Sequence, residues 1–203
     1  MFIGKWNKSV IITYLSVCFG ILAMNFAFTG SFKQAMVFLL FAGIGDLFDG
    51  PVARKCKRDD SEKRFGVELD SLADVFNFAA VPITVFICLG YNEWYHMLLY
   101  FVYGICQIAR LAYFNISLDE DNKNVPVKYY RGVPVTCSAF VFPIVYLISY
   151  VVTGLAFDIV LCSFMLLLAV LHILNIQIPK PKGKAVVLFG LLGVAVIALY
   201  AVI

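Results

Sequence analysis

Four aspartates stand near the ends of two apolar segments, in the stretches GDLFDG and GVELDSLAD. Asp46 and Asp49 are three residues apart, and Asp70 and Asp74 are four apart. Residues with these spacings share one face of an α-helix. Because ionisable groups are costly in a membrane segment, they indicate function there. One loop joins the two segments, so their facing ends can meet, and the pattern predicts that four carboxylates converge in one cleft.

Carboxylates gathered in this way need positive charge close by to stay ionised. Mg²⁺ and Mn²⁺ prefer carboxylate oxygens and often share their coordination shell with substrate phosphates. Two such ions can hold the entering and leaving oxygens of a displacement at phosphorus. The alternative is a set of interfacial acids that balance the basic loop, where an aspartate costs less than the roughly 2.5–3.5 kcal/mol of mid-membrane. Two same-face pairs beside small residues favour the metal interpretation.

The chain that must position these aspartates has the composition of a membrane protein. Of its 203 residues, 62% are hydrophobic and 14% are charged. The apolar runs lack the alternation of a β-barrel, so helices are expected to satisfy the backbone in lipid. We predict an all-α polytopic helix bundle that forms one membrane domain over 1–203. With about 20 residues for each span, the expected spans are 9–29, 34–54, 67–89, 94–116, 133–153, 156–178 and 185–203.

Lysine and arginine are distributed unevenly between the expected connecting segments. With the N-terminus in the cytoplasm, nearly all of them fall on the cytoplasmic side, whereas Lys33 falls outside and Arg110 lies within the fourth span. Cytoplasmic enrichment of these residues orients membrane proteins. We therefore expect a cytoplasmic N-terminus and both acidic pairs on the cytoplasmic side of a bacterial-type cell membrane. The six scattered cysteines read as apolar fillers, and no feature predicts a nucleic-acid partner.

Eight positions of the two acidic stretches follow one pattern, D-x-x-D-G-x-x-A-R and then G-x-x-x-D-x-x-x-D. This pattern resembles the signature of the CDP-alcohol phosphotransferases. The resemblance implies a six-helix core over 7–178, usually a homodimer, with 185–203 as an additional C-terminal helix. It implies that two divalent ions, Mg²⁺ or Mn²⁺, are bound by Asp46, Asp49, Asp70 and Asp74, and that Asp74 is the general base. It also implies contacts to the CDP-bearing substrate from Gly50, Ala53, Arg54 and Gly66.

Further stretches are similar to the membrane-embedded bacterial phosphatidylserine synthases of this family, among them ELDSLADVFNFAAVP, ARLAYFN and RGVP. Four departures stand out. Tyr113 replaces a usual basic residue, Ser16 replaces a usual asparagine, and Thr136 replaces a common second proline. Eleven residues separate Arg54 from Gly66, more than is usual. The additional residues lie in RDDSEKR, where we expect a longer surface loop.

Two arginines outside the signature are candidates for substrate binding. Arg110 lies near the cytoplasmic end of the fourth span, with Gln107 one turn earlier. A guanidinium there suits the phosphate of a lipid donor or the carboxylate of serine. The alternative is an arginine that extends to the interface. The same two interpretations apply to Arg131.

The sequence is interpreted as a phosphatidyltransferase that moves the phosphatidyl group of CDP-diacylglycerol to a small alcohol, releasing CMP. L-serine is the favoured acceptor, and glycerol phosphate, inositol phosphate and choline are alternatives. An intramembrane prenyltransferase also uses aspartate-bound Mg²⁺, but it should carry two separated acid-rich motifs. A divalent-cation transporter should carry acids near mid-membrane and an exit on the far side.

Overall fold

The computed structural model describes residues 3–121, 129–179 and 184–202, and only the backbone of 117–121, 129–131, 178–179 and 184–186. Helices make up nearly all of this part of the chain. In order they are the 3₁₀ turn η1 (Lys8–Val10), α1 (Ile11–Phe28), α2 (Phe32–Lys55), α3 (Asp60–Asp74), the π-helix η2 (Val75–Ala80), α4 (Val81–Cys88), α5 (Trp94–Asp121), the 3₁₀ turn η3 (Val135–Cys137), α6 (Ser138–Ile148), α7 (Leu155–Ile173) and α8 (Lys184–Val202).

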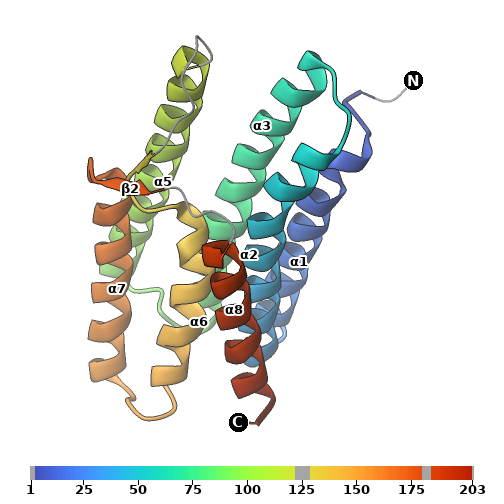
Figure 1. The fold of residues 1–203 in the computed structure, drawn as a ribbon. Coiled ribbons are helices and arrows are strands. Elements are labelled where there is room, and N and C mark those ends of the chain that lie inside the picture. The colour runs from blue at the N-terminus through green and yellow to red at the C-terminus, as the bar shows by residue number, and fades with distance from the viewer. Residues whose placement is uncertain (1–2, 122–128, 180–183, 203) are drawn as a thin grey trace.

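The helices lie side by side in a bundle, with connecting segments at its two ends (Figure 1). Five helical segments among the described residues are long and apolar enough to cross a membrane. They correspond to the first four predicted spans and the sixth, namely Lys8–Phe28, Phe32–Lys55, Asp60–Cys88, Trp94–Ile116 and Leu155–Ile173. The predicted all-α polytopic bundle is thus confirmed, and the chain is an integral membrane protein.

The predicted spans 133–153 and 185–203 correspond to shorter apolar helices, Val135–Ile148 and Val187–Val202. The C-terminal helix α8 is nevertheless part of the bundle. The Tyr200 hydroxyl donates a hydrogen bond of 2.6 Å to the Pro143 carbonyl. A Cβ at Gly193 would lie 3.0 Å from Ile44 Cδ1 and 3.1 Å from Phe140 Cε1, so the glycine allows α8 to approach α2 and α6 closely. In Figure 1, α1 begins at the upper end of the bundle and α8 ends at the lower end.

Helix α3 begins earlier than predicted because Asp59 and Glu62 form a capping box. The Glu62 N–H donates to Asp59 Oδ1 at 2.7 Å, and the Asp59 N–H donates to Glu62 Oε2 at 2.9 Å. The bond from the Glu62 N–H also holds the pKa of the Asp59 carboxyl below its ordinary value. The expectation of a longer surface loop in RDDSEKR is therefore wrong, since most of that stretch forms the first turns of α3.

Two short strands, β1 (Tyr129–Arg131) and β2 (Gln177–Pro179), pair antiparallel, with Arg131 opposite Gln177. The sequence analysis expected no strand, and it expected the sixth span to reach residue 178. Helix α7 instead ends at Ile173, and Leu174 is extended with ψ 128°. Gly132, at φ +75°, then donates its N–H to the Ile176 carbonyl at 2.9 Å.

The π-helix η2 directly follows Asp74 on the third membrane segment. Pro82 has no N–H to donate to the Phe78 carbonyl four residues earlier. Two buried side chains of α5 supply donors instead: the Tyr103 hydroxyl at 2.7 Å and Gln107 Nε2 at 2.9 Å. These bonds fasten the segment that carries two of the aspartates to α5, and they reach a carbonyl to which Pro82 cannot donate.

Candidate active site

Three of the four aspartates form a compact group. Asp46, Asp49 and Asp70 each offer a carboxylate oxygen, and these oxygens lie within 4.8 Å of one another. Asp46 and Asp49 come from one face of α2, and Asp70 comes from α3, as their spacings predicted. The two helices meet here because their joining segment is short. The group can therefore supply ligands from two elements to one ion.

Asp74 completes the set from the next turn of α3. It is buried, and its carboxyl contacts that of Asp46. Among the described residues, no group donates a hydrogen bond to Asp74 Oδ1, although this oxygen is buried. A buried carboxylate oxygen without a donor is unfavourable unless a cation or substrate faces it. The structure thus brings all four predicted aspartates together.

Two threonine hydroxyls hold carboxylates of this group in place. Thr13 Oγ1 from α1 donates to Asp49 Oδ2 at 3.0 Å. Thr136 Oγ1 from η3 donates to Asp46 Oδ2 at 2.6 Å. Neither threonine was predicted as a site residue. Thr136 had drawn notice only as a departure from the family pattern, and nothing in the sequence singled out Thr13.

The oxygen donors fit a hard divalent cation. Positive charge from the protein is limited: Arg110 is buried and lies within electrostatic range of Asp46 and Asp74. Its guanidinium also lies 5.6 Å from the centre of the Phe114 ring. One guanidinium balances one charge, whereas the group carries four carboxyls. An all-carboxylate set with a buried oxygen that lacks a donor suits Mg²⁺ or Mn²⁺ better than a softer metal.

The signature residues with a predicted role in nucleotide binding lie on the same two helices. Arg54 is exposed and lies over Gly50, where a Cβ would be 3.5 Å from Arg54 Nη1. A Cβ at Gly66 would be 3.7 Å from Arg58 Nη1. Ala53 is half-buried one turn after Gly50. The backbone of Arg131 lies in β1, and its side chain is outside the described residues.

The departure at Ser16 is accompanied by an amide on the facing helix. Asn77 Nδ2 donates to Ser16 Oγ at 2.8 Å, and Ser16 Oγ donates to the Ala42 carbonyl at 2.8 Å. A Cβ at Gly20 would lie 2.1 Å from Asn77 Oδ1, so the bare glycine makes room for this amide. The side-chain amide of Asn77 therefore lies at the junction of α1, α2 and η2, although residue 16 is a serine and not the usual asparagine.

A buried polar chain links the aspartates' helices to α6 and α7. The Tyr103 hydroxyl, besides its bond to the Phe78 carbonyl, lies 2.8 Å from Ser138 Oγ. His172 Nε2 lies 3.4 Å from the same Oγ, and His172 Nδ1 lies 3.0 Å from the Val133 carbonyl. The buried position of His172 in this chain gives it partners on both sides of the ring.

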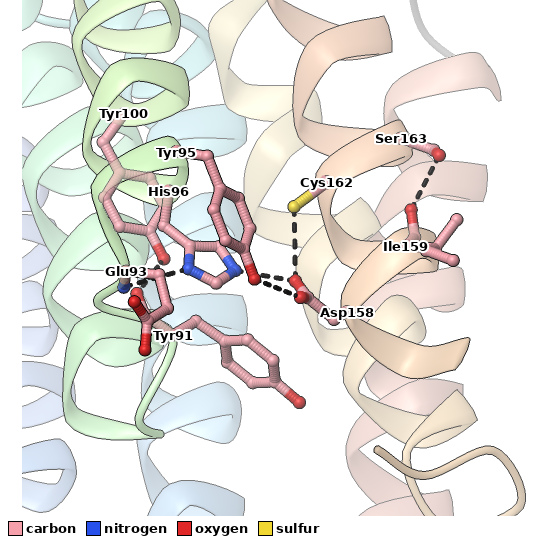
Figure 2. Close-up of polar contacts among 9 residues, drawn as sticks. All are labelled: Tyr91, Glu93, Tyr95, His96, Tyr100, Asp158, Ile159, Cys162 and Ser163. Atoms are coloured by element: carbon pink, nitrogen blue, oxygen red, sulfur yellow. Dashed lines mark hydrogen bonds and ion pairs between the residues drawn. The ribbon is translucent and has the colours of Figure 1, made fainter. Parts of the chain in front are cut away.

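A second group of titratable side chains lies between the first turn of α5 and the first turns of α7 (Figure 2). One atom each of His96, Asp158 and Cys162 lie within 4.8 Å of one another. His96 Nε2 is 2.6 Å from Asp158 Oδ1, and the Tyr95 hydroxyl donates to Asp158 Oδ2 at 2.7 Å. The Glu93 N–H donates to His96 Nδ1 at 3.1 Å.

The hydrogen bond from the Glu93 N–H to His96 Nδ1 determines which ring nitrogen of His96 can donate a proton. Since His96 Nδ1 accepts an N–H, a neutral ring carries its proton on Nε2 and donates it to Asp158. A metal-bound histidine usually has the reverse arrangement, with the free ring nitrogen donating. We therefore interpret His96 and Asp158 as a hydrogen-bonded lock between α5 and α7, and use that name below.

Together, the fold and the aspartate group define a polytopic membrane protein with a cluster of carboxylates that could hold a divalent cation. Residues 6–171 match the model of the CDP-alcohol phosphatidyltransferase family. The chain belongs to this family. The match covers both acidic stretches and every helix from α1 to α6.

Several curated relatives share one kind of name. The chain is 33% identical over 129 residues to the CDP-diacylglycerol–serine O-phosphatidyltransferase of Mycobacterium tuberculosis, covering 63% of this chain and 44% of the relative. It is 32% identical over 142 residues to the protein of that name from Saccharomyces cerevisiae, covering 66% and 49%. It is 29% identical over 174 residues to the archaetidylserine synthase of Methanothermobacter thermautotrophicus, covering 85% and 70%. The chain thus spans less than half the length of the first two.

Proposed function

We propose that this protein is a membrane-embedded phosphatidyltransferase that takes CDP-diacylglycerol as donor and releases CMP. The observation that carries the proposal is the convergence of Asp46, Asp49 and Asp70 within 4.8 Å, with Asp74 in contact. All four occupy the family signature, and membership of the family supports a CDP-linked donor. The rival interpretations, a prenyltransferase or a cation transporter, do not account for Gly50 and Arg54 beside the acids.

The acceptor that we propose is L-serine. The support comes from the names of the relatives, which combine different lipids with the same amino acid. Arg110 is a suitable partner for a carboxylate or a phosphate, because its guanidinium offers a planar pair of donors. It is buried at the depth of Asp46 and Asp74. We assign it to substrate binding, and we assign Arg131 there from the resemblance alone.

The reaction requires that a proton leave the acceptor hydroxyl as its oxygen attacks the phosphorus attached to diacylglycerol. Asp74 receives that proton, a new P–O bond forms, and the bond between this phosphorus and the oxygen of CMP breaks. Asp46, Asp49 and Asp70, with Asp74, hold the divalent ions, of which we propose two. When bound, these ions neutralise charge that develops on the diphosphate. Arg54 and the bare surfaces of Gly50, Ala53 and Gly66 hold the nucleotide.

The proposed orientation has the N-terminus and the aspartates on the cytoplasmic side. Its support is the enrichment of lysine and arginine in the segments at the aspartates' end of the bundle. Soluble CMP and serine would then exchange with the cytoplasm, while the acyl chains of the donor stay among membrane lipids. We also propose a homodimer, as the resemblance implies. Light scattering of the purified protein tests its mass.

The experiment that tests the function is an acceptor screen with purified protein, CDP-diacylglycerol and Mn²⁺ or Mg²⁺. Serine, glycerol phosphate, inositol phosphate and choline are added separately, and CMP release is measured. We expect release that depends on both metal and serine. Release with a different alcohol would keep the chemistry and replace the acceptor. No CMP release with any alcohol would reject the phosphatidyltransferase, and metal uptake by sealed vesicles would then favour a transporter.

A further inference from the structure

We propose that Thr136 is a positioning residue that fixes the carboxylate of Asp46 for metal binding. The inference rests on the proposed metal site. It goes beyond the family signature, because Thr136 lies outside the eight positions of that signature. The Thr136 hydroxyl meets an aspartate ninety positions earlier.

The bond itself is short and assisted by charge. Thr136 Oγ1 donates to Asp46 Oδ2 at 2.6 Å, and both residues are partly buried. Hydroxyl-to-carboxylate bonds of this length are among the stronger hydrogen bonds in proteins. A carboxylate has about four lone-pair positions. Thr136 takes one of them and Asp74 contacts the same carboxyl, so positions remain for a cation.

The backbone around Thr136 is held from several directions. The Val133 N–H donates to the Leu171 carbonyl at 3.1 Å, and the Cys137 N–H donates to the Pro134 carbonyl at 3.1 Å. Val135 is fully buried. At Gly132, a Cβ would lie 2.4 Å from the His172 carbonyl oxygen, so only glycine fits this approach to α7. The hydroxyl is thus presented by a segment fastened to the end of α7.

An aspartate needs such a partner because its own rotamers do not fix its oxygens. The outer torsion of an aspartate side chain joins an sp³ carbon to an sp² carbon, and its energy profile is broad. Without a donor on Oδ2, the Asp46 carboxylate can rotate away from the geometry that a small divalent ion requires. Removing a group that orients a metal ligand typically weakens metal binding by about 10–100-fold.

The test compares Thr136→Val, which keeps the shape and removes the donor, with Thr136→Ser, which keeps the donor. Thr84→Val is the matched control, because the Thr84 hydroxyl is exposed and bonds only the Ala80 carbonyl of its own segment at 2.9 Å. Mn²⁺ binding to the substrate-free protein is titrated by electron paramagnetic resonance. The Mn²⁺ concentration for half-maximal CMP release and the kcat are measured in parallel.

We expect Thr136→Val to raise the Kd for Mn²⁺ by about 10–100-fold and to shift half-maximal activation in the same direction. Thr136→Ser and Thr84→Val should stay within about threefold of the parent. Should Thr136→Val not yield a monodisperse protein, Thr136→Ala takes its place in the same titration. An unchanged Kd in the valine or alanine variant, or an equal loss in the serine variant, overturns the proposal.

Asp46→Asn separates this proposal from the metal site on which it rests. If Asp46→Asn loses Mn²⁺ and Thr136→Val does not, the metal site stands and only the role of Thr136 is rejected. If Asp46→Asn binds Mn²⁺ as the parent does, the assignment of Asp46 as a ligand is rejected, and the role of Thr136 with it. Neither result depends on the identity of the acceptor alcohol, since no substrate is present.

Discussion

Asp74 and Asp70 lie one turn apart on α3, yet their surroundings differ. Asp74 is buried, contacts Asp46 and has an oxygen without a donor among the described residues. Asp70 is half-buried and belongs to the compact group with Asp46 and Asp49. In the proposed reaction, Asp74 is needed as the proton leaves, whereas Asp70 is needed for the charge that binds the diphosphate.

We therefore expect Asp74→Asn to keep measurable affinity for CMP in the presence of Mn²⁺ but to lower the single-turnover rate by about 10²–10⁴-fold, the usual contribution of a general base. Asp70→Asn should lose both affinity and turnover. Calorimetric titration with CMP and rapid-quench kinetics measure the two quantities. If Asp74→Asn loses CMP binding as completely as Asp70→Asn does, Asp74 acts only as a metal ligand and the base is another group.

Arg54 is predicted to hold the diphosphate through two donors of its guanidinium. Arg54→Lys keeps the charge and loses this planar pair, whereas Arg54→Ala loses both. We expect affinity for CMP to fall in the order parent, lysine variant, alanine variant, with the alanine variant weaker by about 1.5–3 kcal/mol, the value of a charged hydrogen bond. Arg58→Ala serves as a comparison from the same end of the bundle. Equal CMP affinity in parent, lysine and alanine variants would remove Arg54 from the site.

At the scale of residues, the sequence predicted contacts that depend on helical spacing and missed those that depend on tertiary approach. Helical spacing alone places Asp46 and Asp49 on one face of α2, and Asp70 and Asp74 on one face of α3. The hydrogen-bond partner of Asp46 is Thr136, which lies in η3. Its position depends on the close approach of Gly132 to the end of α7. No local pattern encodes that approach, so Thr136 could be noticed only as a departure.

The elements of the bundle are joined at the other end of α5 and α7 by the lock of His96 and Asp158. His96 is 2% exposed and Asp158 accepts from three side chains. Asp158→Ala would leave the buried His96 Nε2 without an acceptor, which costs about 1–3 kcal/mol. We expect the Tm in detergent to fall by several degrees, with the Kd for Mn²⁺ at the aspartate group unchanged.

Asp60→Ala is the control for this prediction. Asp60 pairs with Lys63 at 2.9 Å, but their side chains are 90% and 57% exposed, and such surface pairs contribute little to stability. A Tm as high in Asp158→Ala as in Asp60→Ala would contradict the lock. Zn²⁺ that raises the Tm of the parent but not of Asp158→Ala would indicate a metal site there instead.

The positions of the helices followed from hydropathy, whereas several of their ends did not. The start of α3 was readable from Asp59 and Glu62, which have the spacing of a capping box, but the charged stretch was interpreted as a loop. The end of α7 depends on pairing between β1 and β2, two segments far apart in the chain. Hydropathy also carries no signal for η2, whose geometry depends on donors from α5.

For the molecule as a whole, the proposed topology makes a prediction at each face of the membrane. In intact cells, Ser61→Cys should react with a membrane-impermeant thiol reagent only after the cells are opened. Position 61 is exposed beside the aspartates' end of the bundle. The parent protein is labelled in parallel, since it has six cysteines of its own.

A reporter fused after residue 203 should be active outside the cytoplasm, because α8 ends at one end of the bundle and α1 begins at the other (Figure 1). A cytoplasmic reporter would mean that α8 does not cross or that another span does not.

The bond between Thr136 and Asp46 also has a consequence for the order of events during synthesis. The two residues are separated by ninety positions, and ribosomes add roughly 5–20 residues each second. For about 5–18 s, therefore, the growing chain holds Asp46 but not yet the hydroxyl that orients it. The third membrane segment, Asp60–Cys88, is synthesised within this interval, so its aspartates are added before the hydroxyl is available. The proposed cation site is therefore complete only after the segment before α6 has been synthesised.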